Sequence, residues 1–221
     1  MNCIEAFKAT GLQKLRYFLK NKYDTELNYQ RKWVKAYDAN LEKVRSCWFN
    51  QRFLAEILEV CSLGESDRVL DIGCGLASVL NFVGCCQKFA VDPLADEYLK
   101  LHKFDDMTLK KGYGEYLPFP SEYFDAVFCT NALDHTSEPR KVVSEIYRVL
   151  KPNGYAVVLV EIFSNNFWRD PAHPHTFTAS DVLELMSAFD VIIQRNATRN
   201  VNTLDPKEKV QRNDLILLLQ K

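Results

Sequence analysis

Residues 68–80 read Arg-Val-Leu-Asp-Ile-Gly-Cys-Gly-Leu-Ala-Ser-Val-Leu, and this stretch decides the fold. The apolar run at residues 69–72 is typical of a strand buried on both faces of a parallel sheet. Gly73 and Gly75 follow, and the apolar spacing of the next residues predicts a helix that begins at Leu76. In such a turn, glycines let the backbone approach a ligand closely, and the helix start offers unpaired N–H groups. The stretch therefore predicts a site for a nucleotide-like cofactor.

Two side chains near the glycines narrow the type of cofactor. A dinucleotide-binding fingerprint needs a third glycine at the position of Ser78. Asp71 lies at the end of the strand, where a carboxylate attracts an ammonium or sulfonium group and tends to repel a pyrophosphate. The pattern therefore favours a cationic cofactor over a nicotinamide dinucleotide.

The string Val69-Leu-Asp-Ile-Gly-Cys-Gly75 resembles the first motif of the class I S-adenosylmethionine-dependent methyltransferases. Further motifs follow in the family's order up to about residue 162, including Gly-Glu-Tyr-Leu-Pro-Phe at 114–119 and Glu-Ile-Tyr-Arg-Val-Leu-Lys-Pro-Asn-Gly at 145–154. The resemblance is to the small-molecule, quinone-biosynthesis-like branch. It implies a Rossmann-like α/β fold: a seven-stranded, mostly parallel sheet with helices on both faces and an antiparallel last strand. It also implies S-adenosyl-L-methionine as the cofactor.

The cofactor-binding residues are expected along these motifs. Asp92 lies where a doubly wound sheet places a carboxylate that accepts hydrogen bonds from both ribose hydroxyls. The alternative is that this aspartate only forms a turn before Pro93. In the loop that the resemblance assigns to adenine, Tyr113 stands where the family often has an aspartate. The residues predicted to bind the cofactor are Asp71, Gly73, Cys74, Gly75, Asp92, Pro93, Gly114, Glu115, Tyr116 and Asn131.

Asp134 and His135 are the predicted catalytic residues. They follow the strand expected at residues 124–130, and ligands of an open parallel sheet bind outside the carboxyl ends of its strands. General-base catalysis by a histidine contributes about 10²–10⁴-fold to a rate. The alternative is that His135 only holds its own loop in place.

The insert at residues 164–179 is irregular, and long loops beside a pocket are usually functional. Trp168, His173 and His175 are predicted to contact the substrate. A metal site made of Asp170 and the two histidines is not expected, because imidazoles separated by one proline rarely face the same point and no third ligand is evident.

The composition excludes several classes of protein. The net charge of −1 gives no reason to expect a nucleic-acid partner, and no apolar run reaches the roughly 20 residues that span a bilayer. The seven cysteines lack C-x-x-C spacing, which indicates reduced thiols and a cytoplasmic location. We therefore expect a small-molecule acceptor, no membrane partner, and a monomer or homodimer.

Two domains are predicted. Residues 1–50, in which aromatic and charged residues alternate, form a helical N-terminal cap, and residues 51–221 form the S-adenosylmethionine-binding domain. The cap helices either only pack on the main domain or also cover the active site, in which case Trp33 and Tyr37 contact cofactor or substrate.

The predicted function is transfer of the sulfonium methyl group to an oxygen, nitrogen or carbon nucleophile, with positioning as the main contribution of the protein. Two alternatives are open. One is a catalytically inactive S-adenosylmethionine-binding regulator or partner protein of the same fold. The other, disfavoured by Asp71 and Ser78, is a nicotinamide-dependent oxidoreductase.

Overall fold

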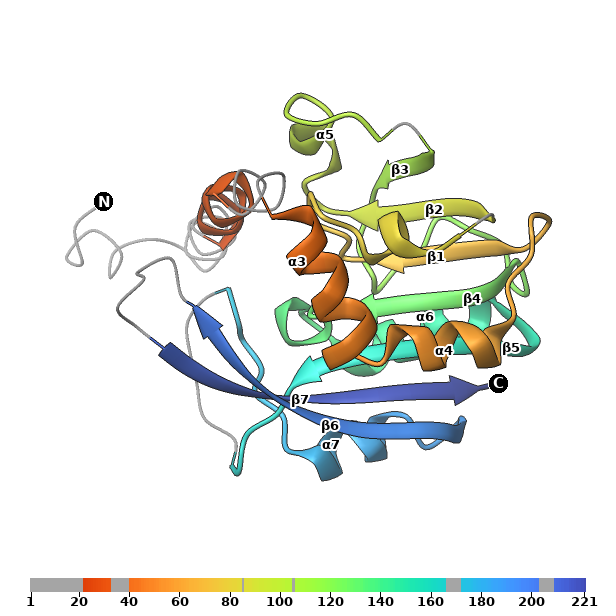
Figure 1. Cartoon of the computed structure of the whole chain (residues 1–221). Helices are drawn as coiled ribbons and strands as arrows, with labels where there is room; N and C mark the ends of the chain where they lie inside the picture. Colours follow the sequence, from red (N-terminus) through yellow and green to blue (C-terminus); the bar gives the residue numbers. More distant parts are fainter. Residues whose placement is uncertain (1–21, 33–39, 85, 105, 166–171, 203–208) are drawn as a thin grey trace, which may run out of the picture.

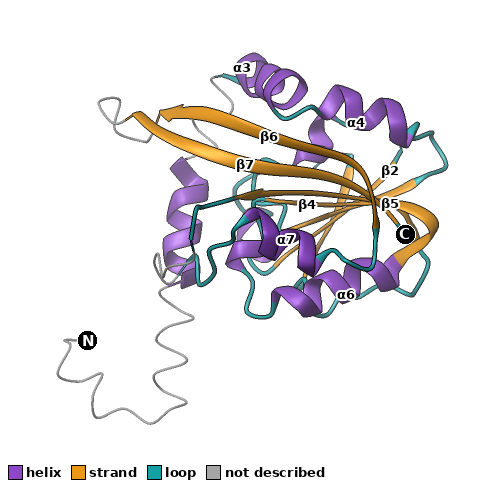
Figure 2. Cartoon of the chain, turned by 90° about the horizontal axis from the view of Figure 1, so that it is seen from below, coloured by secondary structure: helices purple, strands orange, loops and turns teal. Residues whose placement is uncertain are grey.

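A computed structural model describes residues 22–32, 40–84, 86–104, 106–165, 172–202 and 209–221. Seven strands form one sheet in the order β3-β2-β1-β4-β5-β7-β6, with helices on both faces (Figures 1 and 2). The strands are β1 (Arg68–Ile72), β2 (Gln87–Asp92), β3 (Met107–Lys111), β4 (Phe124–Thr130), β5 (Leu150–Glu161), β6 (Asp190–Asn202) and β7 (Lys209–Gln220). Strands β1 to β5 are parallel, and β7 is antiparallel to both of its neighbours. The predicted fold class is confirmed.

The sheet is buried on both sides because its central strands alternate between two apolar clusters. Leu70 and Ile72 of β1 face the cluster under α6 (Pro139–Val149) and α7 (Ala179–Leu185). Val69 faces the cluster under α4 (Leu54–Cys61). Figure 2 shows α3 and α4 on one side of the sheet and α6 and α7 on the other. The chain order reverses between β1 and β4, and ligands of open α/β sheets bind at the carboxyl ends of the strands there.

The helix predicted from Leu76 is absent from this described segment. The structure has instead a short 3₁₀ helix, η2 (Val79–Phe82), which Ser78 begins by accepting a hydrogen bond from the N–H of Leu80. The apolar residues that suggested a helix are nonetheless buried, with Leu76 and Leu80 2% exposed or less. The apolar spacing thus predicted the buried residues correctly, but the prediction of an α-helix was wrong.

Three further helices of the main domain are short. Helix α4 stops at Ser62, which adopts the left-handed conformation, before the glycine that usually marks such an end. Helix α5 is only four residues long (Ala95–Tyr98). Helix α7 begins after Thr178, whose side chain and that of Asp181 form reciprocal capping hydrogen bonds.

The last two strands form a hairpin that extends past the rest of the sheet, as Figure 1 shows. Pairing between β5 and β7 ends at Glu161 and Asp214, whereas β6 and β7 stay paired as far as Asn202 and Lys209.

The N-terminal region contributes a helix over residues 22–32, then α3 (Leu41–Ser46) and a π-helical turn, η1 (Cys47–Gln51), that leads to α4. Trp33 and Tyr37 lie outside the described residues. Within the part of the chain that the structure describes, no helix is both long enough and apolar enough to cross a bilayer.

Candidate functional site

A cavity lies at the carboxyl ends of β1, β2, β3 and β4, with the helix over residues 22–32 as its remaining wall. This helix is the red coil at the strand arrowheads in Figure 1. The cavity and its open mouth together enclose about 790 Å³ of empty space.

The glycine turn after β1 forms the floor of the cavity. Gly73 and Gly75 have φ angles of +69° and +57°, a region that favours glycine. A Cβ atom on Gly73 would lie 2.5 Å from the Cβ of Ala132, so a side chain at Gly73 would displace the loop after β4. The sequence thus places glycines where the backbone must come close to its neighbours.

Asp92 ends β2 and lines the cavity. Its Oδ2 accepts a hydrogen bond from the N–H of Gly75 at 3.1 Å, and its Oδ1 accepts one from the N–H of Leu94 at 2.8 Å. Burial raises the pKa of this carboxyl to about 6. Each carboxylate oxygen keeps a lone pair, so Asp92 can still accept hydrogen bonds from a ligand.

The helix over residues 22–32 presents one face to the cavity, which sequence reasoning missed. Its residues Lys22, Glu26 and Gln30 recur every four positions and all line the cavity. The side-chain oxygen of Gln30 accepts a hydrogen bond from the N–H of Leu76 at 3.2 Å. The Gln30 amide also lies 2.9 Å from where a Cβ on Gly75 would be, so it rests directly on the glycine turn.

Lys22 is the cation among the acidic side chains of this helix face and the neighbouring loops. Its ammonium donates to the backbone carbonyl of His135. Burial lowers the pKa of Lys22, and the carboxylates of Glu115, Glu26 and Asp134 oppose that change. Carboxylates outnumber this cation around the cavity, which favours a positively charged ligand.

The loop after β3 forms the side wall that the resemblance assigns to adenine. Tyr23 and Tyr113 interact through their hydroxyls, and burial, followed by Tyr113, raises the pKa of Tyr23. Glu115 lines the cavity, but its Oε1 accepts hydrogen bonds from the N–H groups of Ser137 and Glu138 at 2.7 and 3.3 Å. Glu115 therefore positions the chain that enters α6.

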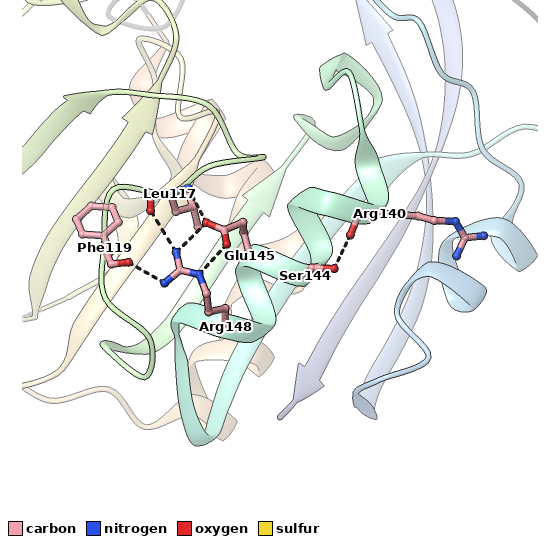
Figure 3. Close-up of polar contacts among 6 residues, drawn as sticks. All are labelled: Leu117, Phe119, Arg140, Ser144, Glu145 and Arg148. Carbon is pink, nitrogen blue, oxygen red and sulfur yellow. Dashed lines mark hydrogen bonds and ion pairs between the residues drawn. The ribbon is translucent and has the colours of Figure 1, made fainter.

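Two residues of α6 hold the continuation of this loop (Figure 3). The Arg148 guanidinium donates to the carbonyls of Phe119 and Leu117 and forms an ion pair with Glu145. Glu145 in turn accepts a hydrogen bond from the N–H of Leu117 at 2.7 Å. This explains why the glutamate, the arginine and the Leu-Pro-Phe segment occur together.

Three residues predicted to bind the cofactor do not line the cavity. Asp71 is 1% exposed, and its Oδ2 accepts a hydrogen bond from the hydroxyl of Ser78 at 2.6 Å. Cys74 packs in the apolar cluster under α4. Tyr116 is 65% exposed and lies against Lys141 at the surface.

The other predicted cofactor residues do lie at the cavity: Gly73, Gly75, Asp92, Pro93, Gly114, Glu115 and Asn131. Asn131 has a φ angle of +53°, and its N–H donates to the carbonyl of Leu159, which fixes the end of β4.

The predicted catalytic residues and one predicted substrate residue come together beside the cavity. Asp134 and His135 belong to the 3₁₀ helix η3 (Leu133–His135), and His135 lines the cavity. The His173 ring, from the segment after β5, lies 4.2 Å from the His135 ring between centroids. His135 also lies between two carboxylates: its Nδ1 is 3.9 Å from Glu26 and its Nε2 is 4.0 Å from Asp134.

His175 is placed away from these residues. It lines a separate hollow between α6 and α7 and stacks on Phe177, and its buried Nε2 has no hydrogen-bond partner among the described residues. Of the two histidines predicted to contact the substrate, His173 thus lies beside His135 at the edge of the cavity, whereas His175 lies at the other hollow. Trp168 lies outside the described residues.

Comparisons with known proteins agree with this geometry. A family model described as a methyltransferase domain matches residues 70–158. YcgJ of Bacillus subtilis, named as an uncharacterized methyltransferase, is 33% identical over 160 residues, which cover 64% of this chain and 63% of YcgJ. A sterol 24-C-methyltransferase of Clavispora lusitaniae is 33% identical over 132 residues, covering 53% of this chain and 34% of that protein. The chain thus spans about a third to two thirds of the length of these curated relatives.

Two solved structures show the same fold. An S-adenosylmethionine-dependent methyltransferase of Methanosarcina mazei matches with a TM-score of 0.57 at 20% identity, covering 72% of this chain and 94% of that one. The [4+2]-cyclase SpnF matches with a TM-score of 0.61 at 20% identity, covering 77% and 80%. At such identities the likeness concerns the fold alone.

Proposed function

We propose that this chain is a class I S-adenosylmethionine-dependent methyltransferase that transfers a methyl group from S-adenosylmethionine to a small-molecule acceptor. The observation that supports this best is the position of Asp92 beside Gly75, because the ribose-type carboxylate and the glycine turn line one cavity. The quinone-biosynthesis-like branch stays a prediction.

The residues around the cavity fit the proposed cofactor. Asp92 would accept hydrogen bonds from the ribose hydroxyls, and the turn at Gly73 and Gly75 would lie under the amino-acid portion. The carboxylates of Glu26 and Glu115 complement a molecule that carries a sulfonium and an ammonium group. Tyr113, at the cavity wall, is available for stacking against adenine.

When bound, S-adenosylmethionine supplies an activated methyl group on a positively charged sulfur. The protein's own contribution is then to bind both reactants in a fixed orientation, which lowers the entropic part of the barrier. For a hydroxyl acceptor, His135 is the proposed base, since it lies at the cavity wall and neutral imidazole accepts protons. The neighbouring Asp134 would help to set the orientation of the ring.

Binding and turnover should be measured separately. Calorimetry with S-adenosylmethionine and its demethylated product tests the cofactor, and preferential binding of a nicotinamide dinucleotide would overturn the family-based proposal. Incubation of the protein with labelled S-adenosylmethionine and fractionated small metabolites then tests transfer. Binding without transfer to any fraction would favour the inactive, cofactor-binding alternative.

For an identified hydroxyl acceptor, His135→Ala should lower kcat by about 10²–10⁴-fold and leave cofactor affinity nearly unchanged. Wild-type turnover in this variant would remove His135 from the proposed mechanism. The His135→Ala variant should methylate an amine that is already neutral at nearly the wild-type rate, because such an amine needs no base.

A further inference from the structure

Asp134, His135 and His173 form a cluster that sequence spacing did not reveal. Each offers one atom that can bind a metal, and these three atoms lie within 4.8 Å of one another. The first two residues lie on η3, after β4, and the third lies 38 positions further along the chain from His135, after β5. Parallel neighbouring strands bring the two loops to the same edge of the sheet.

The donor set and its spacing suit a divalent transition metal. Two imidazoles and a carboxylate are ligands of zinc and of related ions. Bonds of about 2.0–2.1 Å in a tetrahedral site separate neighbouring ligand atoms by roughly 3.3 Å. The observed separation of His135 Nε2 and Asp134 Oδ1 is 4.0 Å, so small side-chain rotations would bring this pair to the ligand spacing.

The surroundings of His135 also match those of a metal ligand. Its Nε2 is directed toward Asp134, and its other ring nitrogen, Nδ1, faces the Glu26 carboxylate at 3.9 Å. A metal-bound histidine usually donates its second ring N–H to a carboxylate or carbonyl, which fixes the ring. The Lys22 ammonium donates to the backbone carbonyl of His135, so this hydrogen bond does not use the ring nitrogens.

The backbone that carries the cluster is fixed by hydrogen bonds. The N–H of His135 donates to the carbonyl of Ala132 at 3.0 Å, and the N–H of His175 donates to the carbonyl of Asp134 at 3.4 Å. The second bond ties η3 directly to the segment that carries His173. These two backbone hydrogen bonds therefore hold the segments that carry the three side chains close to each other.

We propose that Asp134, His135 and His173 bind a divalent transition-metal ion, with Zn²⁺ as the first candidate, at the edge of the cavity. Three protein ligands leave a fourth position for water or for an oxygen or nitrogen atom of the acceptor. The identity of that fourth ligand rests on the proposed function, whereas metal binding itself does not. Because the metal would use the Nε2 lone pair of His135, the general-base role proposed for His135 applies to the metal-free protein only.

The experiment titrates the chelator-treated full chain, without S-adenosylmethionine, with ZnCl₂ by calorimetry and with CoCl₂ by visible absorption. We expect one ion per chain and a Co²⁺ spectrum typical of nitrogen and oxygen ligands. His173→Ala and Asp134→Asn should each weaken binding by at least about 10-fold. Glu26→Gln should weaken it less. The matched control is His102→Ala, because His102 lies against Phe104 and outside the cluster.

Binding that is absent, or that is unchanged in His173→Ala, would overturn the proposal. Binding that disappears when the cysteines are alkylated would also overturn it, since the ligands would then be thiolates. His173→Gln provides a second variant if the alanine variant unfolds, as judged by circular dichroism. The affinity for S-adenosylhomocysteine is measured on the same samples. If the wild-type protein does not bind S-adenosylhomocysteine, the proposed function is refuted, but the metal-binding result still decides the metal proposal by itself.

Discussion

Replacing Asp92 by asparagine should weaken cofactor binding while leaving the fold about as stable as the wild type at pH 8. Two opposing effects on stability can be estimated from the structure. Burial raises the pKa of Asp92 from 3.8 to about 6, so keeping the carboxylate ionised costs about 3 kcal/mol relative to the unfolded chain. An asparagine removes this cost.

The asparagine also loses one acceptor. The carboxylate accepts hydrogen bonds from the N–H groups of Gly75 and Leu94, and the amide nitrogen of asparagine can accept neither. The loss of one such charge-assisted bond costs roughly 1.5–3 kcal/mol, which about offsets the gain. Because the folded-state pKa is raised, the stability that protonated Asp92 contributes is fully present below about pH 4. It is lost as the pH rises through about 6.

Cofactor binding has no such compensation. A ribose hydroxyl that loses its carboxylate acceptor should cost about 1–3 kcal/mol, or roughly 5- to 150-fold in Kd. Calorimetry with S-adenosylhomocysteine and urea unfolding at pH 8 measure the two quantities. Asp96→Asn is the matched control, because Asp96 is an exposed aspartate close in sequence, and its replacement should change neither. An unchanged Kd in Asp92→Asn, or a weaker Kd accompanied by a large loss of stability, would refute direct contact with the ribose.

Three further changes test other parts of the site. Gln30→Ala frees the N–H of Leu76 for the cofactor and should lower the Kd of S-adenosylhomocysteine by about 2- to 10-fold in calorimetry, whereas weaker binding would mean that Gln30 itself contacts the cofactor. Asp71→Asn should raise the free energy of unfolding at pH 8 by up to about 4 kcal/mol and much less at pH 4, because burial raises the pKa of Asp71 from 3.8 to about 7. Equal gains at both pH values would show that the carboxylate is not desolvated. Arg148→Met should cost roughly 2–3 kcal/mol in urea unfolding, since it frees two backbone carbonyls, whereas the exposed Arg140→Met should cost less than about 1 kcal/mol; equal costs would contradict this account.

The parts of the fold that the sequence predicts well are those in which consecutive residues of one segment are buried. Residues 69–72 and 124–130 are mostly apolar because both faces of the central strands are covered, and both segments form strands. Residues 198–202 of β6 carry no such signal, because they lie beyond the point where β7 stops pairing with β5. The segment from Leu76 is apolar because it is buried, and it forms only a short 3₁₀ helix. The apolar spacing alone therefore predicted the wrong element there.

The parts of the site that the sequence did not predict depend on contacts between distant segments. Gln30 meets Leu76 across 46 positions, and no spacing rule connects them. His173 contacts His135 because β4 and β5 are neighbours in the sheet, so the loops that follow these strands lie close together. The closeness of His173 and His175 in sequence did not predict this contact. The prediction for Asp71 rested on a carboxylate next to the glycines, whereas in the structure this carboxylate is buried and accepts a hydrogen bond from Ser78.

Residues from both sides of the domain boundary predicted near residue 50 line the cavity. The strand loops supply Asp92 and the glycine turn, whereas Glu26 and Gln30 come from the N-terminal helix, and Gln30 satisfies an N–H of that same turn. A fragment that began at residue 51 would keep the sheet and its ribose-type carboxylate, but that N–H would lose its partner. It would also lose the carboxylate that faces His135. The helix over residues 22–32 is therefore part of the proposed site itself.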